Sequence, residues 1–397
     1  MRIIVGVAGG IAAYKACEVV SRLVKAGHSV RVVMTPAAAQ FVAPLTFRAL
    51  SGHAVGIEAA DEPAGPLSHV QLAHWAEALV IAPATASLMS RLAHGQTDDL
   101  LGLVYLGIRG PVVAAPAMEP EMWSHPRTQA NASVLRADGV RLVGPAVGRM
   151  ASGQEGLGRM AEPAEIVAAL EDALTPKDLA GTTIVVTAGA TWEHFDPVRV
   201  LTNPSTGLMG VLIANQAARR GADVRLVTGP AVPYAVDDRV RRETVVSAEE
   251  MQRAVIAMAQ DADVVVGAAA VSDFRPRERL GSKAHKDDVG LNWEMVRNPD
   301  IIQSIGERYQ GQKVLVGFAA ETEDVLAQAE AKRRKKHLDA VVANLVGVGR
   351  GFGAGEYGAW LVTAEGPREL GGSKEHTAAA LLDWIRERRA AGHGHIG

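Results

Sequence analysis

Small and polar residues that could hold a phosphate occur twice along the chain. Gly9 and Gly10 follow one apolar run, and TAGAT at 187–191 follows another. After the second run, NPSTG at 203–207 opens a stretch with helical apolar spacing. The first N–H groups of a helix have no partner within it and attract phosphate. The chain is therefore predicted to hold two nucleotide-type sites, one in each half.

Charged residues in the second half favour a polyphosphate ligand. Lys332 and Lys336 are four residues apart and therefore share one face of a helix. Lys283 lies in a polar segment, and Asp273 follows an apolar run. Ammonium groups that converge on one pocket suit a triphosphate. Taken alone, the basic run 332–336 is more typical of a solvated helix face.

The two glycine turns do not have the pattern of a dinucleotide site. That site needs G-x-G-x-x-G and an acidic residue about 20 positions later, at the end of the second strand. The segment VAGGI at 7–11 lacks the spacing, and the second predicted strand of each half ends in a threonine, Thr35 or Thr228. We therefore expect a mononucleotide in each domain.

The elements that must position these residues follow from an alternation of apolar, β-rich runs with helical segments. This alternation predicts βαβ units and parallel sheets. The fold class is predicted to be α/β, with two doubly wound, mostly parallel-sheet, Rossmann-like domains. A polar segment with Pro and Gly at 175–181 is the predicted linker between domains 1–174 and 182–390, and 391–397 is a tail. The expected strands are 2–8, 29–34, 78–82, 111–115, 140–144, 182–188, 223–228, 263–268, 313–318, 339–343 and 358–363.

Composition excludes several classes of protein. The 397 residues carry a net charge of −3, which gives no sign of a nucleic-acid partner. No apolar run approaches the roughly 20 residues that a membrane span needs. The first predicted strand leaves no room for a signal peptide. Cys17 is the single cysteine and cannot form an intrachain disulfide, so we expect a cytoplasmic protein.

Three clusters of the first half follow predicted strands, at 82–87, 115–119 and 152–160. Ligands of open α/β sheets gather at the carboxyl ends of the strands. Small residues there let a flat ligand approach the backbone. The residues expected to converge are Gly9, Thr35, Thr85 and Glu119.

Four motifs cover the first half almost end to end: GGIAAYK at 9–15, SHVQLAHWAEALVIAPATAS at 68–87, PAM at 116–118 and GQEGLGRM at 153–160. In these motifs the first half resembles the flavin-dependent cysteine decarboxylases, in particular the phosphopantothenoylcysteine decarboxylase half of the bifunctional coenzyme A biosynthesis flavoproteins. The resemblance implies a flavodoxin-like domain in which His69 is the active-site histidine and the 152–160 loop clamps the substrate. It also implies that FMN is held by Gly9, Gly10, Thr35, Ala84, Thr85 and Ser87.

Two candidate catalytic residues depart from this family. Glu119 follows PAM, where the family has asparagine, and Ser152 stands where the family has cysteine. An ionised glutamate only accepts hydrogen bonds, and a serine hydroxyl is a far weaker acid than a thiol. We therefore expect slow or absent decarboxylation, although a protonated Glu119 beside the hydroxyl would rebuild the proton donor.

The second half carries a longer ordered set of motifs: TAGAT, DPVR and TNPSTG within 187–207, AAAVSDFR at 268–275, RNPDI at 297–301, VGFAAET at 316–322 and LDAVVAN at 338–344. They resemble phosphopantothenate–cysteine ligase, the other half of the same flavoproteins. The resemblance implies that CTP is the nucleotide, that Mg²⁺ takes part and that Asn203 contacts an acyl-cytidylate. The residues alone do not choose CTP over ATP, and the metal ligands are unknown. The residues implied to bind CTP are Gly267, Ala268, Ala269, Asp273, Lys283, Asn298, Pro299, Asp300, Ile301, Phe318, Lys332 and Lys336.

Together the two resemblances imply a bifunctional enzyme of coenzyme A biosynthesis. It would ligate 4′-phosphopantothenate with cysteine, using CTP, and then decarboxylate phosphopantothenoylcysteine with FMN to 4′-phosphopantetheine. Two alternatives stay open: an active ligase with an FMN-binding but decarboxylase-impaired first domain, and a non-catalytic flavoprotein regulator. The resemblance also implies a homo-oligomer, with trimers of the flavin domain and dimers of the ligase domain.

Overall fold

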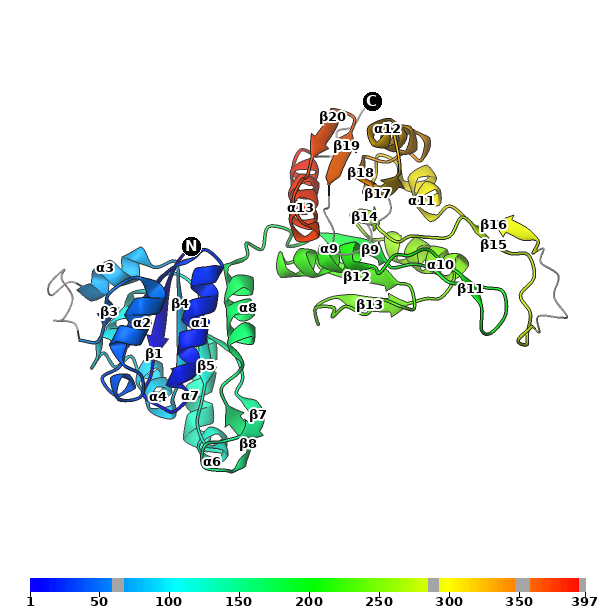
Figure 1. Ribbon diagram of the computed structural model, residues 1–397. Coiled ribbons are helices and arrows are strands. Elements are labelled where there is room, and N and C mark those ends of the chain that lie inside the picture. Colours follow the sequence, from blue (N-terminus) through cyan, green and yellow to red (C-terminus); the bar gives the residue numbers. More distant parts are fainter. Residues whose placement is uncertain (59–67, 285–292, 347–357, 393–397) are drawn as a thin grey trace. The chain divides into compact units, whose positions relative to one another are not determined.

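The computed structural model describes residues 1–58, 68–284, 293–346 and 358–392. It divides the chain into two compact units, Met1–Pro176 and Lys177–Gly397 (Figure 1). The division falls inside the segment expected to be a linker. Most of the tail expected at 391–397 lies outside the described residues. So does Lys286, a second lysine of the polar segment that carries Lys283.

The start of the second unit is packed rather than extended. Leu179 is buried in the core of that unit. The Arg220 guanidinium donates two hydrogen bonds, each of 2.8 Å, to the two carboxylate oxygens of Asp178. Residues 178 and 179, which the sequence assigned to the linker, therefore belong structurally to the second unit.

The main sheet of the first unit has six described strands in the order β3-β2-β1-β4-β5-β6, and each neighbouring pair is parallel. The strands are β1 (Arg2–Val7), β2 (Ser29–Met34), β3 (Val55–Gly56), β4 (Ala78–Ala84), β5 (Val112–Pro116) and β6 (Arg141–Leu142). Every residue of β4 is buried, because helices cover both faces of the sheet. The apolar runs of the sequence reflect this two-sided burial.

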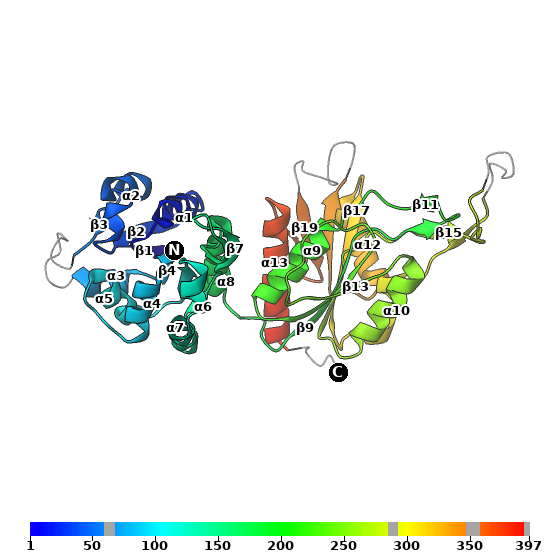
Figure 2. The same cartoon turned by 90° about the horizontal axis from the view of Figure 1, so that it is seen from below.

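Two layers of helices enclose this sheet (Figure 2). On one face lie α1 (Ala13–Lys25), α2 (Pro44–Ser51) and α8 (Pro163–Leu174), which share a core with the sheet. On the other face lie α3 (Ser68–Trp75), α4 (Ala86–Ala93), α5 (Leu100–Gly107) and α7 (Pro126–Ala137). The short helices η1 (Ala38–Gln40) and α6 (Pro120–Ser124) follow β2 and β5. The unit is thus doubly wound.

A hairpin replaces the loop that the sequence suggested at 152–160. Strand β7 (Ala146–Arg149) pairs antiparallel with β8 (Glu155–Arg159). The hairpin packs against the segment after β5, where Met118 N–H donates to the carbonyl of Gly158 at 3.0 Å. A Cβ on Gly158 would lie 2.2 Å from the Met118 carbonyl oxygen, so only glycine permits this approach. The contact fixes the hairpin turn beside Glu119.

The main sheet of the second unit has eight described strands in the order β13-β12-β9-β14-β17-β18-β19-β20. Neighbours are parallel from β13 (Arg241–Thr244) to β18 (Ala340–Leu345), and β19 (Ala359–Thr363) and β20 (Gly366–Glu369) add antiparallel strands at the edge. The remaining strands of the sheet are β12 (Asp223–Thr228), β9 (Thr183–Ala188), β14 (Val264–Gly267) and β17 (Val314–Glu321).

Helices again cover both faces of this sheet. One core holds α9 (Leu208–Arg219) and α13 (Lys374–Ala390), and the other holds α10 (Ala248–Ala259), α11 (Ile301–Tyr309) and α12 (Val325–Lys335). Two short antiparallel pairs project from this unit: β10 (Glu193–His194) with β11 (Val200–Leu201), and β15 (Phe274–Pro276) with β16 (Met295–Arg297) (Figure 1).

The predicted α/β class and each of the expected strands are confirmed. The strands that the sequence missed, such as β3, β7 and β13, are short or exposed and so lack a buried apolar run. Among the described residues, no helix combines the length and the apolar character needed to cross a membrane.

Candidate active sites

The first unit contains a cavity of about 700 Å³ at the carboxyl edge of its sheet, which we call the first-unit cavity. It lies among the segments that follow β1, β4 and β5 and the β7–β8 hairpin. Five of the residues predicted to act here line it together: Gly9, Gly10, Thr85, Ser87 and Glu119. The topology therefore brings together residues that are up to 110 positions apart in the chain.

Two predicted flavin contacts do not line this cavity. Thr35 is buried, and its hydroxyl accepts a hydrogen bond from Ala38 N–H at 3.2 Å, so it supports the turn into η1. Ala84 is wholly buried within β4. Both side chains are therefore buried outside the cavity lining. The residue types alone did not distinguish side chains that line the cavity from buried side chains next to it.

His69 lies on α3 and is also absent from the cavity lining. Its Nδ1 atom is buried and has no hydrogen-bond partner among the described residues. A buried polar atom without a partner costs free energy, so this nitrogen needs an explanation. The chain by itself does not place the histidine where the resemblance implies that it acts.

Glu119 and Ser152 contact each other directly. Ser152 Oγ donates a hydrogen bond of 2.8 Å to Glu119 Oε2. Ser152 is exposed at the hairpin turn and does not line the cavity, whereas Glu119 does. The two departures from the family pattern are thus one structural unit.

The charged residues around this cavity are mostly paired. Glu162 binds Lys15 Nζ at 3.1 Å and Arg159 at 2.5 Å. The hydrogen bond from Lys15 and the charges of both cations outweigh desolvation and lower the pKa of Glu162. Arg149 also lines the cavity and has no ion pair among the described residues.

The first-unit cavity fits a flavin mononucleotide. Its lining includes Ile11, Met118, Met122 and Met160, which offer apolar surface to a planar ring. No side chain caps the N-terminus of α1. The N–H groups of Ala13 and Lys15 donate to the carbonyls of Gly10 and Ala12, so a phosphate here would bind the other N–H groups of this first turn. A Cβ on Gly9 would lie 2.5 Å from that of Ala37, and glycine keeps this part of the wall close to the sheet.

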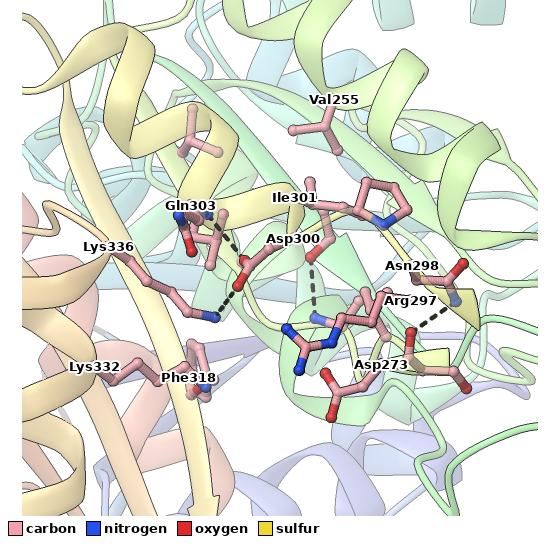
Figure 3. Close-up of a pocket in the computed structure, with 18 of the residues that line it drawn as sticks. Val255, Asp273, Arg297, Asn298, Asp300, Ile301, Gln303, Phe318, Lys332 and Lys336 are labelled. Atoms are coloured by element: carbon pink, nitrogen blue, oxygen red, sulfur yellow. Dashed lines mark hydrogen bonds and ion pairs between the residues drawn. The ribbon is translucent and has the colours of Figure 1, made fainter. Parts of the chain in front are cut away.

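The second unit contains a cavity of about 530 Å³, which we call cavity A (Figure 3). It lies beside β14 and β17 and between α11 and α12. The predicted CTP-binding residues in its lining are Gly267, Ala269, Asp273, Asn298, Pro299, Asp300, Ile301, Phe318, Lys332 and Lys336. Most of the predicted set is therefore gathered in one place.

Lys332 on α12 and Lys336 at its C-cap are held toward cavity A. Lys336 Nζ lies 2.7 Å from Asp300 Oδ2, and Asp300 also caps α11 by accepting from Gln303 N–H (Figure 3). Lys332 Nζ donates to the Phe318 carbonyl at 2.7 Å. Desolvation, followed by the neighbouring Lys336 ammonium, lowers the pKa of Lys332. The basic run is therefore not just a solvated helix face.

Asn298 is used by the protein itself. Its Nδ2 donates to the Ser272 carbonyl at 2.8 Å, and its Oδ1 accepts from Arg275 at 3.1 Å. Its backbone N–H donates to the Asp273 carbonyl at 2.8 Å. This amide fixes the segment that carries Asp273, so Asn298 shapes the cavity wall. One N–H of Nδ2 and one lone pair of Oδ1 remain for a ligand.

A second cavity of about 380 Å³, cavity B, adjoins cavity A. They share Ala269, Val271, Asp273, Phe318 and Lys332 as lining residues and therefore form one continuous site. The predicted residue Ala268 lines cavity B.

The start of α9 forms one wall of cavity B. Gly207 occupies the N-cap position with φ of 78°, and no side chain caps the helix. The free N–H groups suit phosphate oxygens. Asn203 is not among the lining residues, but the lining begins at the next residue, Pro204.

Lys283 lines neither cavity and is exposed. The next residue, Ala284, is anchored: its N–H donates to Asp196 Oδ2 at 3.3 Å. Burial opposes ionisation of Asp196, but the N–H groups of Val198, Arg199 and Ala284 and the Arg199 guanidinium lower its pKa to about 2. The DPVR motif therefore has a structural role. Lys283 therefore lies outside both cavities, and its phosphate contact stays a prediction.

Sequence reasoning missed several charged lining residues. Arg297 and Lys335 line cavity A, Lys374 lines cavity B, and Arg149 lines the first-unit cavity. Arg297 and Lys335 stand inside motifs already recognised, whereas Arg149 had no local signal. No group of three or more metal-binding side chains occurs in the part of the chain that the structure describes.

Comparisons with known proteins agree with this division. Residues 1–175 match the Flavoprotein family, and residues 179–388 match the DNA/pantothenate metabolism flavoprotein C-terminal domain. The Coenzyme A biosynthesis bifunctional protein CoaBC of Haemophilus influenzae is 42% identical over 389 residues, covering 97% of each chain. The protein of the same name from Mycobacterium bovis is 44% identical over 403 residues, covering 97% of this chain and 96% of that one.

A solved structure of the C-terminal domain of a CoaBC protein is 34% identical. It covers 54% of this chain and 99% of that chain, with a TM-score of 0.47. Matches to family models in both halves and relatives of the same full length show that the chain belongs to the family of coenzyme A biosynthesis bifunctional proteins, with a flavoprotein domain followed by the pantothenate-metabolism domain.

Proposed function

We propose that the second unit is a CTP-dependent phosphopantothenate–cysteine ligase and that the first unit is an FMN-dependent phosphopantothenoylcysteine decarboxylase. The two reactions are consecutive steps of coenzyme A biosynthesis, because the ligase product is the decarboxylase substrate. The relatives named as bifunctional proteins match both units and support this pairing. They give no support to a decarboxylase-impaired enzyme or to a non-catalytic regulator.

The ligase reaction must first activate a poor electrophile. A carboxylate oxygen of 4′-phosphopantothenate attacks the α-phosphate of CTP, and pyrophosphate leaves. The amine of cysteine then attacks the acyl-cytidylate and releases CMP. Negative charge develops on the leaving pyrophosphate, and Lys332 and Lys336 offset it from one side of cavity A, with Mg²⁺ supplied by the nucleotide complex.

The observation that best supports this ligase is the continuous site formed by cavities A and B. One part has two converging lysines, and the other has the uncapped N-terminus of α9. A nucleotide in one part and the phosphorylated acid in the other would place the reacting groups near Asp273 and Lys332, which line both. Asn203, next to cavity B, remains the proposed contact to the acyl-cytidylate.

The test is ligation with each of the four nucleoside triphosphates in the presence of Mg²⁺. We expect CTP to be the preferred substrate and CMP to appear in equal amount to the amide product. Formation of CDP and phosphate instead would contradict an acyl-cytidylate. Lys283 keeps a proposed phosphate contact on resemblance alone. Its assignment fails if Lys283→Ala ligates at the wild-type rate.

In the first unit, Gly9, Gly10, Thr85 and Ser87 would hold FMN. The bound flavin would accept an electron pair from the thiol-bearing carbon before decarboxylation and return it afterwards. The chain's own residues bind the substrate and manage its protons. Arg149 is placed to attract a substrate anion, and Glu119 lines the same cavity.

His69 supports the proposal of a homo-oligomer. It lies outside the cavity of its own chain, and its Nδ1 is buried without a partner among the described residues. We place it at the flavin site of a neighbouring copy, as trimers of the flavin domain would allow. Exposed Ile11 and Tyr14 at the cavity rim offer apolar surface for such a contact. Dimers of the ligase domain and a cytoplasmic location complete the proposal.

A further inference from the structure

One hydrogen-bonded pair connects solvent with the first-unit cavity. Ser152 is exposed, and its Oγ donates to Glu119 Oε2 at 2.8 Å. Glu119 lines the cavity, but Ser152 does not. A hydroxyl that faces water is thus one hydrogen bond away from a carboxyl group that faces the cavity.

Decarboxylation of the substrate consumes a proton. The bond between Cα and the carboxylate carbon breaks, carbon dioxide leaves, and the electron pair stays with the remaining carbon framework. A new C–H bond then forms where the carboxylate was, and its hydrogen must arrive as a proton. One proton per turnover must therefore pass from solvent to the substrate.

We propose that Glu119 and Ser152 form the inlet for this proton, an inference that rests on the proposed decarboxylation. Protonated Glu119 gives its proton to the carbon that has lost the carboxylate. The resulting carboxylate regains a proton from the Ser152 hydroxyl, which takes one from water. Glu119 is the catalytic acid in this scheme, and Ser152 is a positioning residue that acts through it.

The surroundings leave this pair free to act. The other charged groups that line the cavity are Lys15 on α1, Arg149 on β7 and Arg159 on β8. Glu162 holds both Lys15 and Arg159. Glu119 occupies the N-cap position of α6 but does not cap it, so its carboxylate is directed to Ser152 instead. Arg149 lies beside Gly153 and lines the cavity, where it can attract the carboxylate of the bound substrate.

The test measures carbon dioxide release from phosphopantothenoylcysteine by the full-length, flavin-loaded protein over a range of pH. Glu119→Gln cannot carry a proton, and we expect a loss of about 10²- to 10⁴-fold. Ser152→Ala should lose less, about 10-fold or more, and change the pH profile, while Ser152→Thr should restore both. Glu121→Gln is the matched control, because Glu121 lies on the same helix, is exposed and does not line the cavity.

Infrared difference spectra provide a readout that needs no turnover. The Glu119 carboxyl band is identified by its absence from Glu119→Gln. In Ser152→Ala that band should shift, with or without flavin, because its hydrogen-bond donor is gone. The proposed proton inlet would be contradicted if Glu119→Gln released carbon dioxide at the wild-type rate. It would also be contradicted if Ser152→Ala left the carboxyl band and the pH profile unchanged. Failure of the proposed function is distinct, because the wild type itself would then release no carbon dioxide.

Discussion

At the scale of single residues, Lys332 joins the two parts of the ligase site. It lines both cavities, and its pKa is lowered by burial and by Lys336. Lys332→Met should reduce ligase activity by about two to three orders of magnitude, because a charge-assisted donor is lost. In the wild type, the alkaline fall in activity should begin below the ordinary lysine pKa of 10.5, since the ammonium deprotonates early.

The control for Lys332 is Arg334→Gln. Arg334 is on the same helix but is exposed and binds Glu330 at 2.6 Å, away from both cavities. We expect this variant to ligate at the wild-type rate. Steady-state rates from pH 6 to 10, with thermal unfolding to confirm folding, are the measurements. Equal losses in the two variants would assign the effect to the helix rather than to the ammonium group.

Also at the residue scale, activity should be kept only when Glu119 and Ser152 are replaced together. Glu119→Asn/Ser152→Cys installs the residues of the family pattern, in which the thiol is the acid, and should decarboxylate within about tenfold of the wild type. Glu119→Asn alone leaves a serine without its carboxyl partner and should lose about 10²-fold or more. A double-mutant cycle on carbon dioxide release measures the coupling. Additive losses would show that the two side chains act separately.

At the scale of elements, the hairpin β7–β8 depends on a close backbone contact. Gly158→Ala would place a Cβ 2.2 Å from the Met118 carbonyl oxygen, and a backbone atom cannot move aside cheaply. We expect the first unit to lose about 1–3 kcal/mol of stability and the flavin to bind more weakly, because the hairpin lines the cavity. Denaturant unfolding and flavin retention on gel filtration are the measurements.

The matched control for Gly158→Ala is Gly148→Ala on the paired strand. Its Cβ would meet the Arg159 side chain, 2.8 Å from Cδ, and a flexible side chain can shift. A small effect there and a large one at Gly158 would locate the constraint in the backbone contact. If the two variants unfold alike, hairpin packing is not limiting.

At the scale of the whole molecule, each unit has its own buried cores. A fragment 177–397 should therefore fold and ligate, because it keeps Leu179 and the Asp178–Arg220 ion pair. A fragment 182–397 loses both and should be less stable by roughly 3 kcal/mol or more. Urea unfolding of the two fragments compares them directly. If the two fragments were equally stable, residues 175–181 would be only a linker.

Flavin binding is expected to require more than one copy of the chain. The first-unit cavity is bordered by exposed Ile11 and Tyr14, and His69 lies outside it. Light scattering combined with flavin absorbance should show stoichiometric flavin only in an oligomer. Dilution to a monomer should release it. A monodisperse monomer that retains one flavin per chain would exclude the shared site.

The sequence by itself determined the sheets and the sheet edges at which most of the candidate-site residues gather. Strands such as β4 are buried on both faces, so their apolar runs are visible locally, and the carboxyl ends of parallel strands share one edge. Gly9, Thr85 and Glu119 meet at that edge for this reason. These features depend on residue type and local spacing, which a sequence displays.

Only the tertiary structure decided which side chains face a cavity and which support it. Thr35 turns inward to hold η1, and the Asn298 amide binds the Ser272 carbonyl. Ser152 meets Glu119 across 33 positions, through a hairpin whose seating depends on Gly158. A hydrogen bond requires two atoms to meet within a few tenths of an ångström, and that meeting is set by long-range packing. Residue types alone do not show which side chains will meet this closely.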